Sequence, residues 1–146
     1  ATYRKVQFLL EWSTDIGQSV ELVHRLKEVQ TEREANEIYF LPKQRNRLLD
    51  MLRELIEGME ALGPLNGPVE LSRKQEMDAL RRIEIHLSSA GILREQMRLK
   101  HVEHARKGRY SLEGGMVFNE MGNLFEEVAL RIGILTTKYE EIFKVS

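Results

Sequence analysis

The sequence predicts an all-α fold: an up-down bundle of four to five helices with a long first and a long last helix. Apolar residues recur three and four positions apart along most of the chain, which is the period of a helix. Proline occurs only three times, so long helices can run without interruption. No segment alternates apolar and polar residues over the length of a strand. With 146 residues the chain can bury a sizeable core as one domain, residues 1–146.

The first helix is expected to run from Thr2 to about Leu41, because this segment contains no proline and keeps the helical period. Pro42 either ends this helix or begins the next one, since proline is tolerated in the first turn of a helix but not in its interior. The second helix is expected over residues 43–62, where apolar residues repeat at alternating spacings of four and three, as in the seam of a bundle.

The loop 63–68, Gly-Pro-Leu-Asn-Gly-Pro, is the clearest break in the sequence. A third helix is expected to start near Ser72, because Gln75 three positions later completes a capping box. The small residues at 88–91 are expected to kink or interrupt it, and a fourth segment then covers residues 92–106. The last helix is expected to run from about Leu112 almost to the end of the chain.

The composition narrows the possible function classes. Lysine and arginine number 22 against 23 acidic residues, so the strongly basic face typical of nucleic-acid binding is not expected. There is no cysteine, which excludes disulfides and thiol redox chemistry. No apolar run approaches the roughly 20 residues of a membrane span, and no signal peptide is visible. Because the chain begins with Ala1 and helices reach both ends, we expect a domain excised from a longer signalling protein.

Enzymatic activity is not expected. The sequence contains no serine–histidine–aspartate order, glycine-rich phosphate loop or carboxylate pair in a suitable context. His101 and His104 lie three positions apart on a helix and could present two imidazoles to one metal. No third ligand lies at a matching position, so we expect surface histidines and neither a metal nor a cofactor.

One arginine is predicted to face the interior of the bundle. Leu22, Leu26 and Val29 form an apolar stripe, and Arg33 falls on the same stripe at about 100° per residue. Arginine stays charged in proteins, and burying it without a partner costs several kcal/mol. Either a carboxylate of the fold meets Arg33, with Glu37 four positions on as a candidate, or a ligand does. The sequence leaves both open.

Two further residues could carry function. Arg94 could approach Arg33 in the bundle core, whereas a surface position paired with Glu95 agrees equally well with the helical phase. His24 is expected to be exposed, and the run His-Arg-Leu-Lys at 24–27 resembles the core of histidine phosphotransfer domains. Glu28 stands where those domains carry glycine, so phosphotransfer through His24 is an alternative and not the first choice.

Short motifs along most of the chain resemble nitrate- and nitrite-sensing domains. Residues 22–26 (LVHRL), 29–33 (VQTER) and 38–41 (IYFL) look like the signature on the first long helix of that family, and Gln44-Arg45 opens the second helix as it does there. Leu93-Arg94, Tyr110 and residues 118–124 (FNEMGNL) resemble later elements of the family. One departure is Glu34, which replaces a glycine of the family and lowers the positive potential beside Arg33.

The resemblance implies a non-enzymatic ligand-sensing input domain of a signal-transduction protein. In that family arginines bind a small anion, nitrate or nitrite, between helices; Arg33 matches the motif arginine and Arg94 a second one. The resemblance also implies the periplasmic or extracellular part of a membrane receptor, although a cytoplasmic position stays open. A homodimer is expected, because such relays commonly act across a two-fold interface. The alternative is a helical protein-interaction module in which Arg33 is permanently paired with Glu37.

Overall fold

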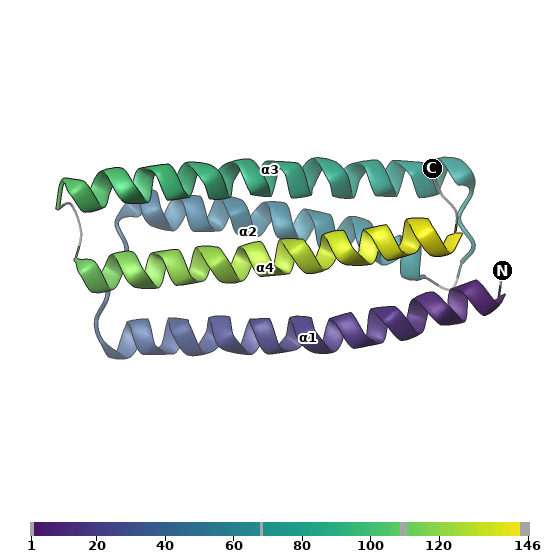
Figure 1. The fold of residues 1–146 in the computed structure, drawn as a ribbon, viewed down its shortest axis with the longest axis horizontal. Helices are drawn as coiled ribbons and strands as arrows, with labels where there is room; N and C mark the ends of the chain where they lie inside the picture. The colour runs from purple at the N-terminus through teal and green to yellow at the C-terminus, as the bar shows by residue number, and fades with distance from the viewer. Residues whose placement is uncertain (1, 68, 109–110, 144–146) are drawn as a thin grey trace.

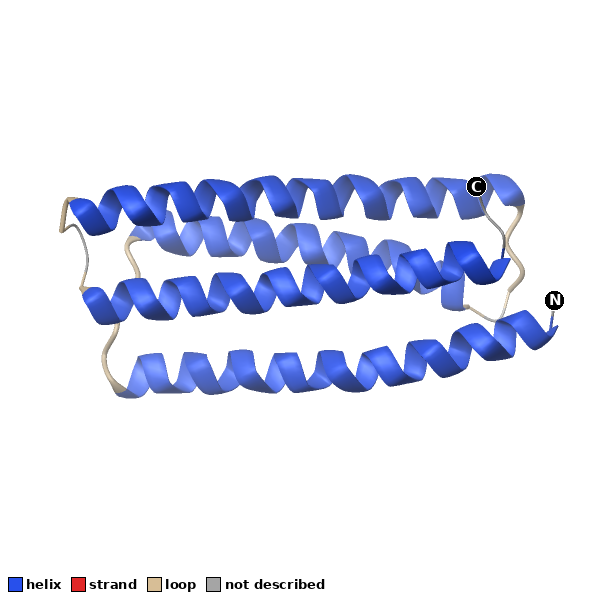
Figure 2. Ribbon diagram, in the orientation of Figure 1, coloured by secondary structure: helices blue, strands red, loops and turns tan. Residues whose placement is uncertain are grey.

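The structure is a computed structural model that describes residues 2–67, 69–108 and 111–143. Within those ranges the chain forms four α-helices and one short 3-10 helix, and no strand (Figures 1 and 2). The helices are α1 (Thr2–Ala35), α2 (Pro42–Leu62), α3 (Arg73–Arg106) and α4 (Leu112–Phe143), and the 3-10 helix η1 (Gly63–Asn66) follows α2 directly. Successive helices run in opposite directions, so the predicted up-down bundle is confirmed.

The first helix is shorter than the sequence suggested, because the expectation that it reaches Leu41 is wrong. Helix α1 ends at Ala35, and Glu37 adopts a left-handed backbone conformation with φ of 53°. The amide of Ile38 then donates to the carbonyl of Arg33 at 2.9 Å, which is the hydrogen bond of a Schellman helix end. Pro42 occupies the first turn of α2 and therefore begins the second helix.

Helix α3 is continuous, and the interruption expected at 88–91 does not occur. Ala90 is fully buried in the core, while Gly91 lies on the open side of the helix with nothing near its missing side chain. A glycine inside a helix costs only about 1 kcal/mol, which packing against α2 and α4 outweighs. The predicted capping box at the start of α3 is confirmed, since Ser72 and Gln75 exchange two hydrogen bonds of 3.2 and 2.9 Å.

The core lies mainly among α2, α3 and α4, and α1 packs against α4. At the N-terminal end of α1, Phe8 is fully buried and its ring meets that of Tyr139 edge-on, with 5.1 Å between the centroids. On the same pair of helices, Lys138 donates to Glu11 at 2.9 Å and to Asp15 at 3.1 Å. Helix α1 makes little direct contact with α2, which leaves room between these two helices. In the described ranges, no helix is long and apolar enough to cross a lipid bilayer.

Candidate functional site

A cavity of about 580 Å³ lies where the end of α1, the α1–α2 loop, the start of α2 and the middle of α4 meet. Helix α1 packs on α4 and makes little contact with α2, and the cavity lies between α1 and α2. Its polar lining residues are Gln30, Arg33, Glu34, Tyr39 and Arg45. Its apolar lining residues are Phe40, Leu48, Leu49, Leu52, Met121 and Phe125. The helical phase predicts that Arg33 faces inward. In the structure its half-buried side chain forms part of the cavity wall.

Neutral groups hold the guanidinium of Arg33 in place. Its Nε donates to the side-chain oxygen of Gln30 at 3.0 Å, and its Nη1 donates to the backbone carbonyl of Ile38 at 2.9 Å. Its Cζ lies 4.9 Å from the centre of the Phe40 ring, a cation–π contact. Both hydrogens of Nη2 remain without a protein acceptor among the described residues. The group is therefore fixed in position and can still donate to a ligand.

The internal counter-charge that the sequence allowed for Arg33 is not formed. Glu37 lies beyond the end of α1, in the left-handed turn, and so loses the one-turn spacing that an ion pair with Arg33 requires. The carboxylate of Glu34 instead accepts a hydrogen bond from the amide of Gln30 at 3.0 Å. Among the residues that the structure describes, no carboxylate forms an ion pair with Arg33.

Arg45 is a second cation of the cavity, and sequence reasoning did not assign it a role. It lies on the first turn of α2 and is brought near Arg33 by the loop that reverses the chain between the two helices. Glu34 is the single acid among the described lining residues, which therefore carry a surplus of one positive charge. Three other cavities along the described bundle have as many acidic as basic lining residues, or more. The Arg33 cavity is thus the one of these four that suits an anion.

Arg94 does not line this cavity. It is buried between α3 and α4, with 2% of its side chain exposed, and its Nη2 donates to the side-chain oxygens of Asn119 at 3.0 Å and Asn123 at 2.6 Å. Its Nε lies 3.3 Å from a carboxylate oxygen of Glu126. Burial lowers the pKa of Arg94 below its ordinary value, and the charge of Arg98 lowers it further. The structure therefore does not bring Arg33 and Arg94 to one ligand; Arg94 fastens α3 to α4.

Gly122 makes the position of Arg94 possible. A side-chain Cβ at Gly122 would lie 2.8 Å from Cζ of Arg94 and 2.9 Å from its Nη1. The guanidinium lies close to α4 at Gly122, in space that the Cβ of any other residue would occupy. The sequence gives one signal for this contact: a glycine in the middle of a long helix, where it lowers helix stability unless close packing requires it.

The histidines take different positions. His24 is exposed on α1, as a phosphoacceptor would have to be. His101 and His104 were expected at the surface, but His104 is buried with 7% exposed, and the ring of His101 stacks on Phe118 with 6.4 Å between the centroids. In the described residues, no group of three histidine, aspartate or glutamate side chains is arranged to hold a metal ion.

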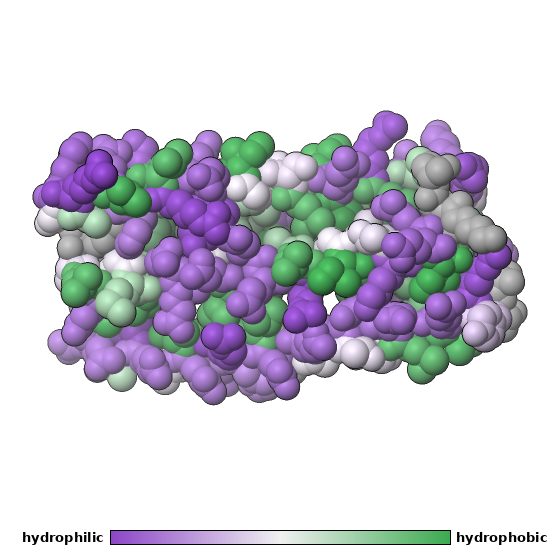
Figure 3. Space-filling model, in the orientation of Figure 1, coloured by the Kyte–Doolittle hydropathy of each residue, from purple (hydrophilic) through white to green (hydrophobic). Residues whose placement is uncertain are grey.

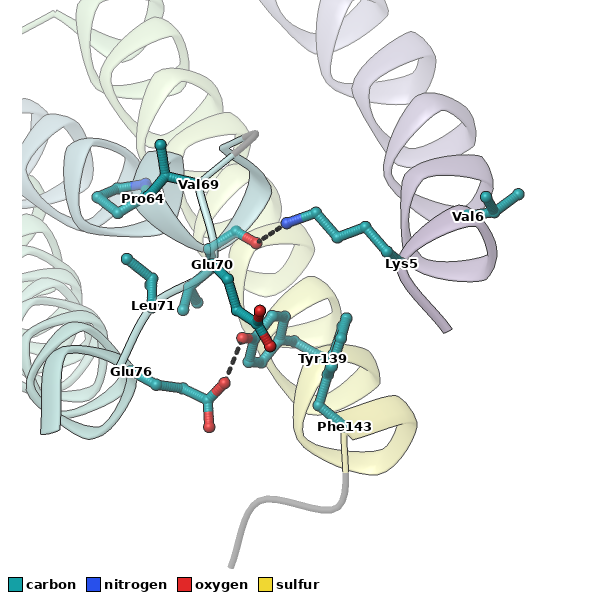
Figure 4. Close-up of a pocket in the computed structure, with 10 residues that line it drawn as sticks. Lys5, Val6, Pro64, Val69, Glu70, Leu71, Glu76, Tyr139 and Phe143 are labelled. Atoms are coloured by element: carbon teal, nitrogen blue, oxygen red, sulfur yellow. Dashed lines mark hydrogen bonds between the residues drawn. The ribbon is translucent and has the colours of Figure 1, made fainter. Parts of the chain in front are cut away.

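A second cavity, of about 370 Å³, lies at the opposite end of the bundle between the start of α1, the α2–α3 connection and the end of α4 (Figure 4). Its only basic lining residue, Lys5, donates to the backbone carbonyl of Leu65 at 3.2 Å. Two carboxylates, Glu70 and Glu76, also line it, so its charge disfavours an anion. The hydroxyl of Tyr139 donates to Glu76 at 2.5 Å across this cavity.

Tyr139 is expected to make the bundle lose stability at alkaline pH. Burial, followed by the hydrogen bond and the charge of Glu76, raises the pKa of Tyr139 above its ordinary value. The unfolded chain then releases the phenol proton near pH 10, while the folded protein keeps it. The contribution of Tyr139 to the free energy of unfolding is therefore complete below about pH 10 and declines above it. In Tyr139→Phe, the free energy of unfolding should be about 1 kcal/mol lower at neutral pH and should fall less steeply above pH 10. Urea unfolding at a series of pH values measures both.

The exposed Tyr39 provides the control for this prediction, because 79% of it is accessible. Tyr39→Phe should leave the alkaline decline of wild type unchanged. Equal slopes above pH 10 in Tyr139→Phe and wild type would show that the buried phenol does not govern the decline.

Comparisons of the chain with protein-family models, with curated proteins and with solved structures found no match. The resemblance to nitrate- and nitrite-sensing domains therefore stays a prediction.

Proposed function

We propose that this chain is a non-enzymatic, ligand-sensing input domain of a signal-transduction protein that binds a small anion between helices at Arg33. One observation carries the proposal: the guanidinium of Arg33 lines a cavity, is held by neutral acceptors, and has no carboxylate partner in the described part of the chain. A fixed, half-buried cation with unused donors gains more from an anion than a solvated one does, because charge-assisted hydrogen bonds strengthen where water is excluded.

Ligand binding would act on the packing of α1. This helix rests on α4 and contacts α2 little, and the cavity occupies the space between α1 and α2. A ligand that touches both helices favours the arrangement in which they are close over one in which they are farther apart. The population of the close arrangement rises by a factor set by the ligand's difference in affinity for the two. The first and last helices, α1 and α4, would then relay the shift to an output domain.

The motif resemblance supports the same function, and it alone supports two finer proposals. The first is a receptor whose sensor lies outside the cytoplasm. The second is a nitrate- or nitrite-like ligand, and it competes with the larger anion that the size of the cavity favours. Arg94 has a structural role in this proposal. It binds α3 to α4 and thereby fixes α4, the helix against which α1 packs. Arg45 takes the place of the second cation at the ligand.

Arg33→Ala is expected to weaken anion binding by about tenfold or more, because the lost charged hydrogen bonds are worth about 1.5 kcal/mol or more. Isothermal titration calorimetry with nitrate, nitrite and benzoate measures the loss. Arg25→Ala, an exposed arginine on the same helix, is the matched control and should bind as wild type does. Equal binding by Arg33→Ala and wild type would contradict the proposal. Absence of heat with every anion would favour the helical protein-interaction module instead.

A further inference from the structure

We infer that the ligand of the Arg33 cavity is a monocarboxylate with an apolar body, such as an alkyl or aryl carboxylate, and not a small inorganic anion. The inference rests on the proposed function, because it names the ligand class of the same site. Size, charge and the arrangement of the walls each support it.

The cavity is much larger than an inorganic anion. It measures about 580 Å³, whereas a water molecule takes about 30 Å³ and a four-atom anion such as nitrate only roughly twice that. Nitrate at Arg33 would therefore leave most of the space to water. That water would lie against apolar walls, which gain free energy when an apolar group covers them.

The charge of the lining matches one negative charge. Arg33 and Arg45 face a single acid, Glu34, so a monoanion balances the cavity and a dianion does not. Carboxylates suit a guanidinium that has adjacent donors in one plane. Arg33 still offers the second hydrogen of Nη1 together with those of the adjacent Nη2, since its Nε and one hydrogen of Nη1 are already bound to Gln30 and Ile38.

Apart from Phe40, which contacts Arg33, much of the apolar wall lies away from the two cations. The cations come from the last turn of α1 and the first turn of α2, while Leu48, Leu52 and Phe125 lie farther along α2 and α4. A carboxylate bound at Arg33 would thus direct its body toward the leucines. Pockets for small organic ligands commonly combine a mainly apolar lining with a few polar groups that fix orientation.

A series of acetate, butyrate and hexanoate tests the inference by calorimetry. Burial of about two methylene groups is worth roughly tenfold in affinity, so each step should strengthen binding by about tenfold, and benzoate should displace nitrate. Leu52→Gln should flatten the dependence of affinity on chain length. Leu130→Gln, at an exposed leucine of α4 outside this cavity, should behave as wild type.

Each outcome separates the two proposals. If nitrate binds through Arg33 but hexanoate binds no more tightly than acetate, the ligand class is wrong and the sensor function stands. If affinity rises with chain length in Arg33→Ala as well, the apolar walls bind without the cation and the ligand class is wrong. If no anion binds, both proposals fail.

A different surface carries a second inference, independent of the cavity. We propose that the outer face of α3 binds the same face of a second copy of the chain, antiparallel, with the two-fold axis at Ile92. Three apolar side chains seven residues apart lie exposed on this face: Ile85 (55% exposed), Ile92 (61%) and Leu99 (65%). Hydrophobic (green) side chains recur along the upper edge of the space-filling view, where α3 lies (Figure 3). A seven-residue apolar repeat is the pattern by which helices pair side by side.

The charges around this stripe specify the antiparallel arrangement. In it, residues equally far before and after Ile92 face one another, so Ile85 meets Leu99 of the other copy. The charged residues that meet are then opposite in sign: Arg81 with Glu103, and Asp78 with Arg106. Within its own helix Glu103 also pairs with Lys100 and Lys107. In a parallel, in-register pair each of these charges would meet itself and repel. A two-fold interface requires such a self-complementary face.

Single cysteines test this geometry cleanly, because the chain has none of its own. Ile92→Cys should form a disulfide-linked dimer on mild oxidation. Ile85→Cys alone should not, because the two copies of residue 85 would lie about 14 residues, or roughly 21 Å, apart along the helices, beyond the reach of a disulfide. A mixture of Ile85→Cys and Leu99→Cys should yield the linked heterodimer. Leu130→Cys, exposed on α4, is the control and should form no disulfide-linked dimer.

Charge exchange provides a second readout by sedimentation equilibrium. Arg81→Glu should weaken self-association by about tenfold, and addition of Glu103→Arg should restore it. Linkage of Ile85→Cys to itself would indicate a parallel pair and overturn the proposal. Equal linkage at residue 130, or a monomer at every concentration, would overturn the interface altogether.

Discussion

Gly122→Ala is expected to lower the free energy of unfolding by about 2 kcal/mol, although alanine is the better helix former. The new Cβ would lie 2.8 Å from Cζ of Arg94. That guanidinium cannot withdraw easily, because it is buried and its Nη2 is bound to Asn119 and Asn123. Either the asparagine hydrogen bonds break or α3 and α4 move apart. Urea unfolding followed by circular dichroism measures the change.

Gly91→Ala is the matched control, since it is the same substitution within a long helix. Nothing lies within 4 Å of the Cβ that it would add. The gain in helix propensity should therefore stabilise the protein, by up to about 1 kcal/mol. Opposite signs at the two glycines would identify close packing on Arg94 as the cause. Stabilisation by both substitutions would mean that Gly122 is not needed for the contact between α3 and α4.

Arg94→Ala should destabilise the bundle by about 3 kcal/mol, because it removes one of the largest fully buried side chains. Its neighbour Arg98 is the control: it shares the carboxylate of Glu126, at 2.5 Å, but is 45% exposed. Arg98→Ala should cost less than about 1 kcal/mol, as surface ion pairs do. Equal losses from the two substitutions would show that the shared carboxylate, and not burial, governs the stability here.

The same two positions should be strongly coupled. Without the guanidinium, the three atoms nearest to a Cβ at residue 122 are gone, so Gly122→Ala in the Arg94→Ala background should be neutral or slightly stabilising. A double-mutant cycle should give a coupling energy of about 2 kcal/mol. Simple additivity would mean that the two substitutions act through separate contacts.

The fold class could be predicted because long helical periods dominate this sequence, and the two errors have physical causes. Helix α1 ends through the left-handed turn at Glu37, whereas such turns usually carry glycine or asparagine, so no residue there marked the end. The break at 88–91 was expected from local preference for a turn. Burial of Ala90 between helices overrides that preference, and no single-sequence pattern reports it.

The candidate site could be predicted in part. Helical phase alone turns Arg33 toward the interior, and the structure has it on a cavity wall. Arg45 could not be found this way, because its place depends on how the α1–α2 loop reverses the chain. The buried position of Arg94 could not be predicted because a break was expected at 88–91. Helix α3 is in fact continuous, so Arg94 lies on the same buried face as Ile83 and Ala90, and Ile92 is exposed.

The most direct test of the central claim is a crystal structure of the protein with 4-bromobenzoate, because bromine can be located by its anomalous scattering. We expect the carboxylate to accept hydrogen bonds from Nη2 of Arg33 and the bromine to lie beside Leu52 and Phe125. Binding only in the cavity at Lys5 and Tyr139, or a guanidinium of Arg33 that keeps just Gln30 and Ile38 as partners in saturated crystals, would contradict the claim.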